Sequence, residues 1–103
     1  MFTVYITDLA RSDIQEAFDW WSDNRSPAQA SVWYDRIVSS ISTLAEMPNR
    51  CPVVTEADLA RKGVRQLLFG AGHRATHRIL FSIDDATNSV TILRVRHHSQ
   101  FDV

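Results

Sequence analysis

The stretch that decides the fold is residues 64–100, VRQLLFGAGHRATHRILFSIDDATNSVTILRVRHHSQ. Three of its segments are rich in β-branched and aromatic residues and are predicted to be strands: Val64–Phe69, Ala75–Asp84 and Ser89–His97. A Gly-Ala-Gly break separates the first two, and the turn signal Asp85–Asn88 separates the last two. Connections this short join antiparallel strands. The stretch therefore predicts a three-stranded antiparallel meander.

The residues before the meander show helical periodicity. Phe2–Ile6 alternates at period two and is predicted to be a short strand. Thr7 or Asp8 is then expected to cap a helix that runs to about Asn24. Its apolar stripe repeats at three- and four-residue spacing and consists of Ala10, Ile14, Ala17, Phe18 and Trp21. Trp20 lies beside that stripe, at the edge of the core or half exposed.

A second helix is predicted to begin at Ser26-Pro27-Ala28-Gln29, which combines a capping serine, a proline in the first turn and a glutamine three residues after the cap. It is expected to stop at Met47-Pro48. Its apolar face consists of Ala30, Trp33, Ile37, Ile41 and Leu44. Because one or two residues join the helices, they are expected to fold back as an αα-hairpin. Residues 49–63 are predicted to be a loop with about one helical turn.

This order of elements, β-α-α-β-β-β, predicts an α+β two-layer fold in which the hairpin covers one face of the sheet. A chain of 103 residues is expected to form one domain, residues 1–103. No segment has the composition of a membrane span or a signal peptide, and the expected location is the cytoplasm. The single cysteine, Cys51, excludes an internal disulfide and a cysteine-based metal cage. We expect no metal and no cofactor.

The net charge of −1 hides an asymmetry between the two parts of the chain. Residues 1–60 carry four arginines against nine acids, a net charge of −5. Residues 61–103 carry seven lysines and arginines against three acids, a net charge of +4, and all four histidines. A chain polarised in this way can meet a polyanion or an acidic protein on one side. Random surface charge on a small domain explains the asymmetry about equally well.

Three segments carry a resemblance to a known family. They are Gly63–Leu67 (GVRQL), His77–Ile83 (HRILFSI) and Ile92–His98 (ILRVRHH). In their order and spacing, and in the order of the predicted elements, the chain resembles the RelE/ParE family of bacterial toxins over nearly its whole length. The resemblance implies a small growth-inhibiting toxin of a type II toxin–antitoxin system, including plasmid-stabilisation systems, which a cognate antitoxin silences by wrapping its surface in a toxin–antitoxin hetero-oligomer.

The family divides by target, so the resemblance leaves two activities open. RelE-like members are metal-free, ribosome-dependent mRNA endonucleases, whereas ParE-like members inhibit DNA gyrase. Metal-free RNA cleavage needs a base, a cation that stabilises charge on phosphate, and an acid for the leaving oxygen. Arginine and histidine suit these roles. The candidate catalytic residues are Arg65, Arg78, Arg96, His97 and His98.

The resemblance assigns these candidates unevenly. Arg78 matches the arginine that contacts the scissile phosphate in nuclease-type members, and Arg65 lies where those members carry a lysine or another polar residue. The ending Arg96-His97-His98 resembles the Arg-Tyr-His ending of some nucleases, which implies a general acid at His98. In the alternative registration, His97 matches the histidine that ends the sheet in ParE-like members and has no catalytic role.

Strand geometry limits how the candidates combine. His97 and His98 are adjacent on a strand and point to opposite faces, so at most one of them joins a given site. A one-residue slip across the turn decides whether Arg78 shares a face with Arg94 and Arg96. Arg65 and Arg78 are equally consistent with outward-facing strand residues or salt-bridge partners of the acidic half.

Departures from the nuclease pattern favour DNA gyrase as the target over the ribosome and mRNA. The terminal tyrosine of those members is replaced, with Ser99 after His98, and lysine occurs only once, at Lys62. Ribosomal RNA is a dense polyanion whose binding draws on many cationic contacts. An inactive antitoxin-binding module is the third possibility. In each case the antitoxin is expected to be acidic where it crosses Arg65, Arg78 and Arg96.

Overall fold

A computed structural model gives the architecture, and it describes residues 1–70 and 76–97. The elements follow the predicted order: β1 (Thr3–Ile6), α1 (Asp8–Asn24), α2 (Pro27–Ser42), 3-10 helices at Thr43–Ala45 and Pro48–Arg50, α3 (Ala57–Arg61), β2 (Arg65–Phe69), β3 (His77–Asp84) and β4 (Ser89–His97). The predicted α+β fold is confirmed. The bounds of β4 are as predicted, and β2 begins one residue later than expected. The expected start of the middle strand at Ala75 lies outside the described residues.

Helix α2 ends five residues before the predicted stop, because side chains compete for its last carbonyls. The hydroxyl of Ser42 donates to the carbonyl of Ser39 at 2.7 Å, and that of Thr43 donates to the carbonyl of Ser40 at 2.6 Å. Such local bonds offer the backbone an alternative to the α-helical ladder. The chain tightens into the 3-10 turn at Thr43–Ala45.

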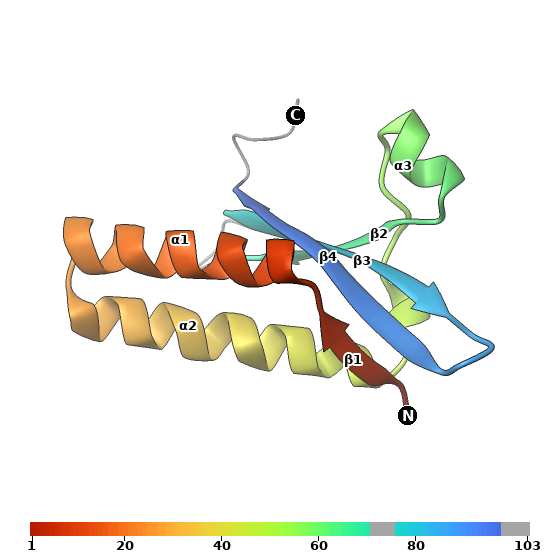
Figure 1. The fold of residues 1–103 in the computed structure, drawn as a ribbon, viewed down its shortest axis with the longest axis horizontal. Coiled ribbons are helices and arrows are strands. Elements are labelled where there is room, and N and C mark those ends of the chain that lie inside the picture. The colour runs from red at the N-terminus through yellow and green to blue at the C-terminus, as the bar shows by residue number, and fades with distance from the viewer. Residues whose placement is uncertain (71–75, 98–103) are drawn as a thin grey trace.

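The four strands form one sheet in the order β1-β4-β3-β2. The pairs β2–β3 and β3–β4 are antiparallel, as the meander predicts, and β1 pairs with β4 in parallel, from Thr3 beside Ser89 to Ile6 beside Ile92. Figure 1 shows α1 and α2 as an antiparallel pair on one side of this sheet, with α3 on the far side beyond β2. The hairpin thus covers one face, and among the described residues no strand pairs with the outer edge of β4 beyond Ile92.

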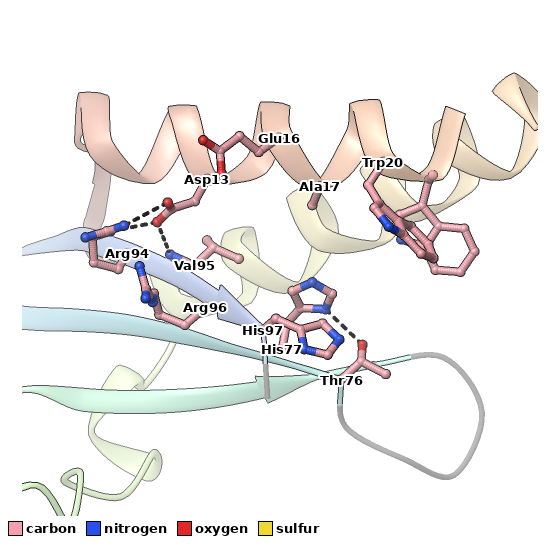
Figure 2. Close-up of a pocket in the computed structure, with 11 residues that line it drawn as sticks. Asp13, Glu16, Ala17, Trp20, Thr76, His77, Arg94, Val95, Arg96 and His97 are labelled. Atoms are coloured by element: carbon pink, nitrogen blue, oxygen red, sulfur yellow. Dashed lines mark hydrogen bonds and ion pairs between the residues drawn. The ribbon is translucent and has the colours of Figure 1, made fainter. Parts of the chain in front are cut away.

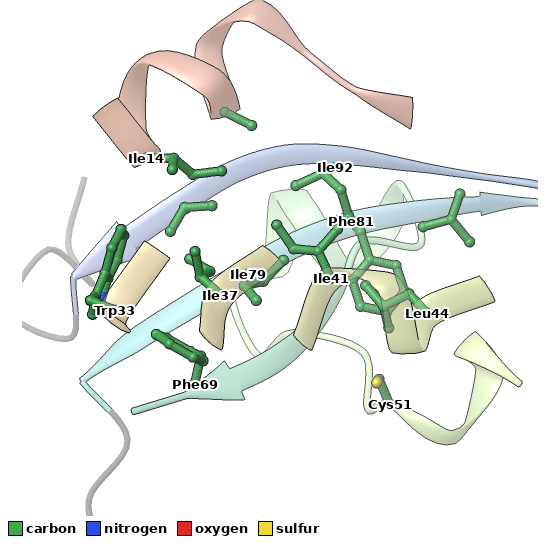
Figure 3. Close-up of a cluster of buried hydrophobic side chains, with 13 residues drawn as sticks. Ile14, Trp33, Ile37, Ile41, Leu44, Cys51, Phe69, Ile79, Phe81 and Ile92 are labelled. Carbon is green, nitrogen blue, oxygen red and sulfur yellow. The ribbon is translucent and has the colours of Figure 1, made fainter. Parts of the chain in front are cut away.

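The main core lies between the hairpin and the sheet (Figure 3). Trp33, Ile37 and Ile41 on α2 pack against alternate residues of the strands, among them Ile79 and Phe81, which are fully buried. The predicted stripe of α2 is therefore the face that it buries. Each such side chain contributes about 1.5–3 kcal/mol through the removal of its apolar surface from water.

A second, smaller core lies on the opposite face of the sheet. Val54, Val64 and Leu80 are buried there, and Leu59 and Ala60 of α3 pack against them. Residues 52–54 are bound to β2 and the residue before it by two backbone bonds, Val54 N–H to the Val64 carbonyl and Gln66 N–H to the Pro52 carbonyl, both at 3.0 Å. Most of the predicted loop, residues 52–63, is therefore a strap across the second face.

The register of β3 and β4 contains a β-bulge. Leu80 lies opposite Arg94, and Phe81 lies opposite Ile92, so Leu93 is the additional residue. A bulge of this kind shifts the alternation of one strand relative to the other. Beyond it, Arg78 lies opposite Arg96 and His77 lies opposite His97. Arg78 and Arg96 therefore share the strap face, and the two histidines share the hairpin face.

Thr7 links α1 to β4 and gives the first testable prediction. Its hydroxyl accepts the Ala10 N–H at 3.1 Å as the N-cap of α1 and donates to the carbonyls of Ile92 and Leu93, at 2.9 and 3.1 Å. We expect Thr7→Val to lower the free energy of unfolding by about 1–2 kcal/mol, because shape is kept while both roles are lost. Urea unfolding measures this. Ser26→Ala, which removes an exposed cap with one bond, is the control and should cost about 1 kcal/mol or less.

Candidate functional site

A groove of about 680 Å³ opens between α1 and the C-terminal half of β4 (Figure 2). Helix α1 supplies one wall and β4 the other, and Thr76 and His77 lie at its inner end. The residues that line it are Asp13, Glu16, Ala17, Trp20, Trp21, Thr76, His77, Arg94, Val95, Arg96 and His97. Its volume is in the range of ligand and partner grooves.

Asp13 ties the two walls together at one end of the groove. Its carboxylate accepts from Arg94 Nε at 2.8 Å and Nη2 at 3.0 Å, and from the backbone N–H of Val95 at 2.9 Å. The hydrogen bond that Arg94 donates to Asp13 raises the pKa of Arg94 above its ordinary value. These three bonds hold α1 against the open edge of β4 and compensate both charges internally.

The helical wall carries an exposed aromatic residue. Trp20 is 51% exposed, and its ring stands edge-on to that of Trp21 at 5.5 Å, while Trp21 packs against the main core. The α1 residues at this wall recur at three- and four-residue spacing: Asp13, Glu16, Ala17 and Trp20. Figure 2 shows Trp20 beyond Ala17, over the end of the groove where the two histidines lie. Exposed aromatic residues of this kind are enriched in protein interfaces relative to the rest of the surface.

His77 and His97 lie side by side at the inner end of the groove. Their ring centroids are 5.1 Å apart, and His77 also contacts the rings of Trp33 and Phe69. His77 is only 7% exposed, and its Nδ1 lies 2.9 Å from the Thr76 hydroxyl. Burial, with a smaller contribution from His97, lowers the pKa of His77 to about 4. His77 is therefore neutral at physiological pH, and His97 is the exposed member of the pair.

Arg78 lies on the other face of the sheet, away from the groove. Its Nη1 and Nη2 bind the two oxygens of Glu56 at 2.6 and 3.0 Å, and its Nε donates to Gln66 Oε1 at 2.8 Å. The residue is 4% exposed. The hydrogen bond from Arg78 lowers the pKa of Glu56 below its ordinary value. The guanidinium fork that would suit a phosphate is occupied by a carboxylate of the strap.

The remaining candidates are dispersed. Arg65 lies opposite Phe81 on the hairpin face, and its Nη1 donates to the Cys51 carbonyl at 2.6 Å, so it anchors the chain before the strap. Arg96 and His97 line the groove, and His98 lies outside the described residues. Among the described candidates, only Arg96 and His97 share a cavity.

Within residues 1–70 and 76–97, no group of three histidine, cysteine or acidic side chains is arranged to hold a metal ion.

Sequence reasoning missed three residues of this site: Asp13, Trp20 as a groove wall, and His77. A signal for the first two was present, because Asp13, Glu16 and Trp20 recur at helical spacing beside the apolar stripe. His77 gave no such signal, since its burial depends on packing against Trp33 of another element.

No helix in the described part of the chain has both the length and the hydropathy of a membrane span.

A comparison with protein families decides the assignment of the chain. The family described as the ParE toxin of type II toxin–antitoxin systems, parDE, matches residues 4–100. The chain belongs to the ParE toxin family. No curated protein sequence matches it closely enough to count as a relative. The predicted resemblance to RelE/ParE toxins is confirmed, because this ParE-family match covers nearly the whole chain.

Two solved structures are similar to this ParE-family chain. The chromosomal ParDE toxin–antitoxin system from P. aeruginosa is similar with a TM-score of 0.75 at 20% identity, over 94% of this chain and 96% of that one. The RelBE2 toxin–antitoxin complex from Mycobacterium tuberculosis is similar with a TM-score of 0.61 at 28% identity, over 94% and 98%. The first likeness establishes the fold alone. The family match places this ParE-family member in the RelE/ParE superfamily of type II toxins, and the second likeness agrees with it.

Proposed function

We propose that this ParE-family toxin acts on DNA gyrase and is neutralised by a cognate antitoxin. The observation that carries the choice of target is the position of Arg78. This residue was the best candidate for holding a scissile phosphate, yet its guanidinium is buried on the strap face and bound to Glu56 and Gln66. Arg96 and His97 lie in a different cavity. Arg78 therefore does not face the same space as His97, and these two residues cannot serve one phosphate.

The charge of the chain supports the same proposal. A net charge of −1 and a single lysine offer few cationic contacts to a ribosome, whose RNA is recognised largely through phosphate. Glu16, an exposed acid of α1 that lines the groove, adds repulsion towards a polyanion on that side. Binding to a protein target does not require such contacts.

Expression of the chain with and without the adjoining reading frame tests the proposal. We expect growth arrest from the toxin alone, relief when the adjoining product is present, inhibition of supercoiling by purified gyrase, and intact transcripts. The arrested cells should show DNA damage.

Three other results would contradict it in distinct ways. Cleaved transcripts with normal supercoiling would indicate a ribosome-dependent mRNA endonuclease, and the loss of cleavage in a folded Arg96→Ala or His97→Ala variant would place its chemistry in the groove. Tight binding of the adjoining product without growth arrest would indicate an inactive antitoxin-binding module. Normal growth and no binding would exclude a toxin–antitoxin pair.

A further inference from the structure

We propose that a hollow at one end of the main core binds a small aromatic acid, a single ring that carries a carboxylate and one further hydrogen-bond acceptor. The hollow has a volume of about 180 Å³ and lies between α1, α2 and the end of β2. It shares only Trp21 with the groove between α1 and β4. The ligand binds independently of the cellular target, because neither gyrase nor an antitoxin takes part.

Three elements form the walls of this hollow. Helix α2 supplies side chains at three- and four-residue spacing, α1 supplies one tryptophan, and β2 supplies its last residue. The lining is mostly apolar and consists of Trp21, Gln29, Val32, Trp33, Arg36 and Phe69. An engineered apolar cavity of about 150 Å³ is large enough for benzene. The hollow therefore accepts one aromatic ring and is too small for a drug-sized molecule.

Aromatic side chains surround the position of the ligand ring. Trp33 is 5% exposed and Phe69 is 7% exposed, and their rings meet edge-on with centroids 6.0 Å apart. Figure 3 shows both at the same end of the core. Trp21 is partly buried against the same core. Because aromatic rings attract one another beyond the effect of burial alone, an aromatic ligand fits these walls better than an aliphatic one.

The indole N–H of Trp33 indicates a polar atom on the ligand. Its Nε1 is buried and has no hydrogen-bond partner among residues 1–70 and 76–97. A buried donor without an acceptor is costly and uncommon in native proteins. Trp33 lines the hollow, so a molecule bound there can accept this hydrogen bond. A hydroxyl oxygen or a ring nitrogen of the ligand is the acceptor.

Polar side chains of α2 determine the charge of the ligand. Arg36 is exposed, and no carboxylate among the described residues forms an ion pair with it. Gln29 lies two turns earlier in the same wall. A guanidinium beside an apolar hollow favours a carboxylate, because its planar fork binds both oxygens. Since water screens an exposed pair, Arg36 adds modestly to affinity and mainly selects an acid over a neutral analogue.

Four probes test this ligand class: benzoate, 3-hydroxybenzoate, nicotinate and the neutral benzamide. NMR follows the indole N–H signals of the full chain, which has three tryptophans, during titration at neutral pH. We expect the tighter of 3-hydroxybenzoate and nicotinate to bind with a dissociation constant of about 0.1–1 mM, as befits about ten non-hydrogen atoms. It should shift the Trp33 signal and bind at least about threefold more tightly than benzoate, which lacks the second acceptor.

Substitutions then assign each contact. Arg36→Gln should weaken the binding of benzoate by about threefold and leave benzamide unchanged, whereas Arg11→Gln, at an exposed arginine of α1 outside the hollow, should change neither. Trp33→Phe should remove the advantage of the second acceptor, and Trp20→Phe, in the groove, should keep it. Circular dichroism and urea unfolding establish that each variant is folded. If Trp33→Phe does not fold, the Trp33 signal of the wild-type chain decides.

The other outcomes contradict the proposal in different ways. Binding that is lost in Trp20→Phe but survives Arg36→Gln and Trp33→Phe would place the ligand in the groove. Equal binding of benzoate and benzamide would overturn the charge of the ligand. An unchanged Trp33 signal with every probe would indicate that water satisfies the indole N–H. A shift caused only by the product of the adjoining reading frame would assign the hollow to a protein side chain. Growth arrest and supercoiling are unaffected by any of these results.

Discussion

Glu56→Gln should lower the free energy of unfolding by about 3 kcal/mol. The substitution keeps the shape of the side chain but removes the charge that compensates Arg78, whose guanidinium is 4% exposed and lies directly across from Arg96. Removal of one partner of a buried ion pair costs about 3–5 kcal/mol. The lower end of this range applies because the Glu56 side chain is 33% exposed and water partly screens its charge. Urea unfolding at neutral pH measures the difference.

The chain supplies a matched control on the same strap. Asp58 pairs with Arg61 across one turn of α3, and both side chains are exposed. Asp58→Asn should therefore change stability by no more than about 0.5 kcal/mol. The double variant Glu56→Leu with Arg78→Met should recover most of the loss, since apolar replacement of a buried pair is often neutral. Equal losses in Glu56→Gln and Asp58→Asn would show that the Arg78 pair contributes nothing.

Stability should fall by about 2 kcal/mol between pH 7 and pH 5 because of His77. Burial lowers its pKa to about 4, whereas in the unfolded chain it titrates near 6.5. Between about pH 6.5 and pH 4, His77 is protonated in the unfolded state but neutral in the folded state, so acidification favours unfolding. The full effect, reached near pH 4, is about 3 kcal/mol. Urea unfolding at pH 7, 6 and 5 avoids most carboxylate titration.

Two variants isolate this residue. His77→Phe keeps an aromatic ring against Trp33 and Phe69 and should remove most of the loss between pH 7 and pH 5. His97→Gln should retain most of it, because burial is the larger cause of the lowered pKa and His97 the smaller one. An unchanged pH profile in His77→Phe would assign the acid sensitivity to other groups.

The fold could be predicted from the sequence because its signals are local. The turn at Asp85–Asn88, the cap at Ser26 and the apolar stripe of α2 all depend on residues within one or two turns of each other. The same signals predicted two of the three pairs of neighbouring strands, β2–β3 and β3–β4. The pairing of β1 with β4 was not predicted, since residues 3–6 and 89–92 are distant in sequence and parallel pairing leaves no hairpin signal.

The candidate site was harder to predict because it depends on register and burial. Arg78 and Arg96 share a face, which is one of the two registers that the sequence allowed. Arg78 is bound by Glu56 of the strap, a segment whose sequence shows no clear periodicity, so this ion pair could not be predicted. The sequence correctly indicated arginine and histidine on the last strand, where Arg96 and His97 line the groove. It could not show that Arg65 binds the Cys51 carbonyl and Arg78 binds Glu56, because exposed and paired arginines look the same in a sequence.

The bulge at Leu93 inverts the alternation of side chains between the two faces of β4. Before the bulge, even-numbered residues of β4 such as Ile92 face the hairpin, and after it odd-numbered residues such as Val95 do. Deletion of Leu93 would remove the bulge and leave Arg96 opposite Arg78 and His97 opposite His77. A strand that kept Leu93 but lost the bulge would instead place Arg94 opposite Ile79 and exchange the sides on which Arg96 and His97 emerge. Relatives with the same fold and nearly the same ending can thus present opposite chemistry to a partner. An alignment that ignores the bulge at Leu93 would equate residues that lie on opposite faces of the sheet.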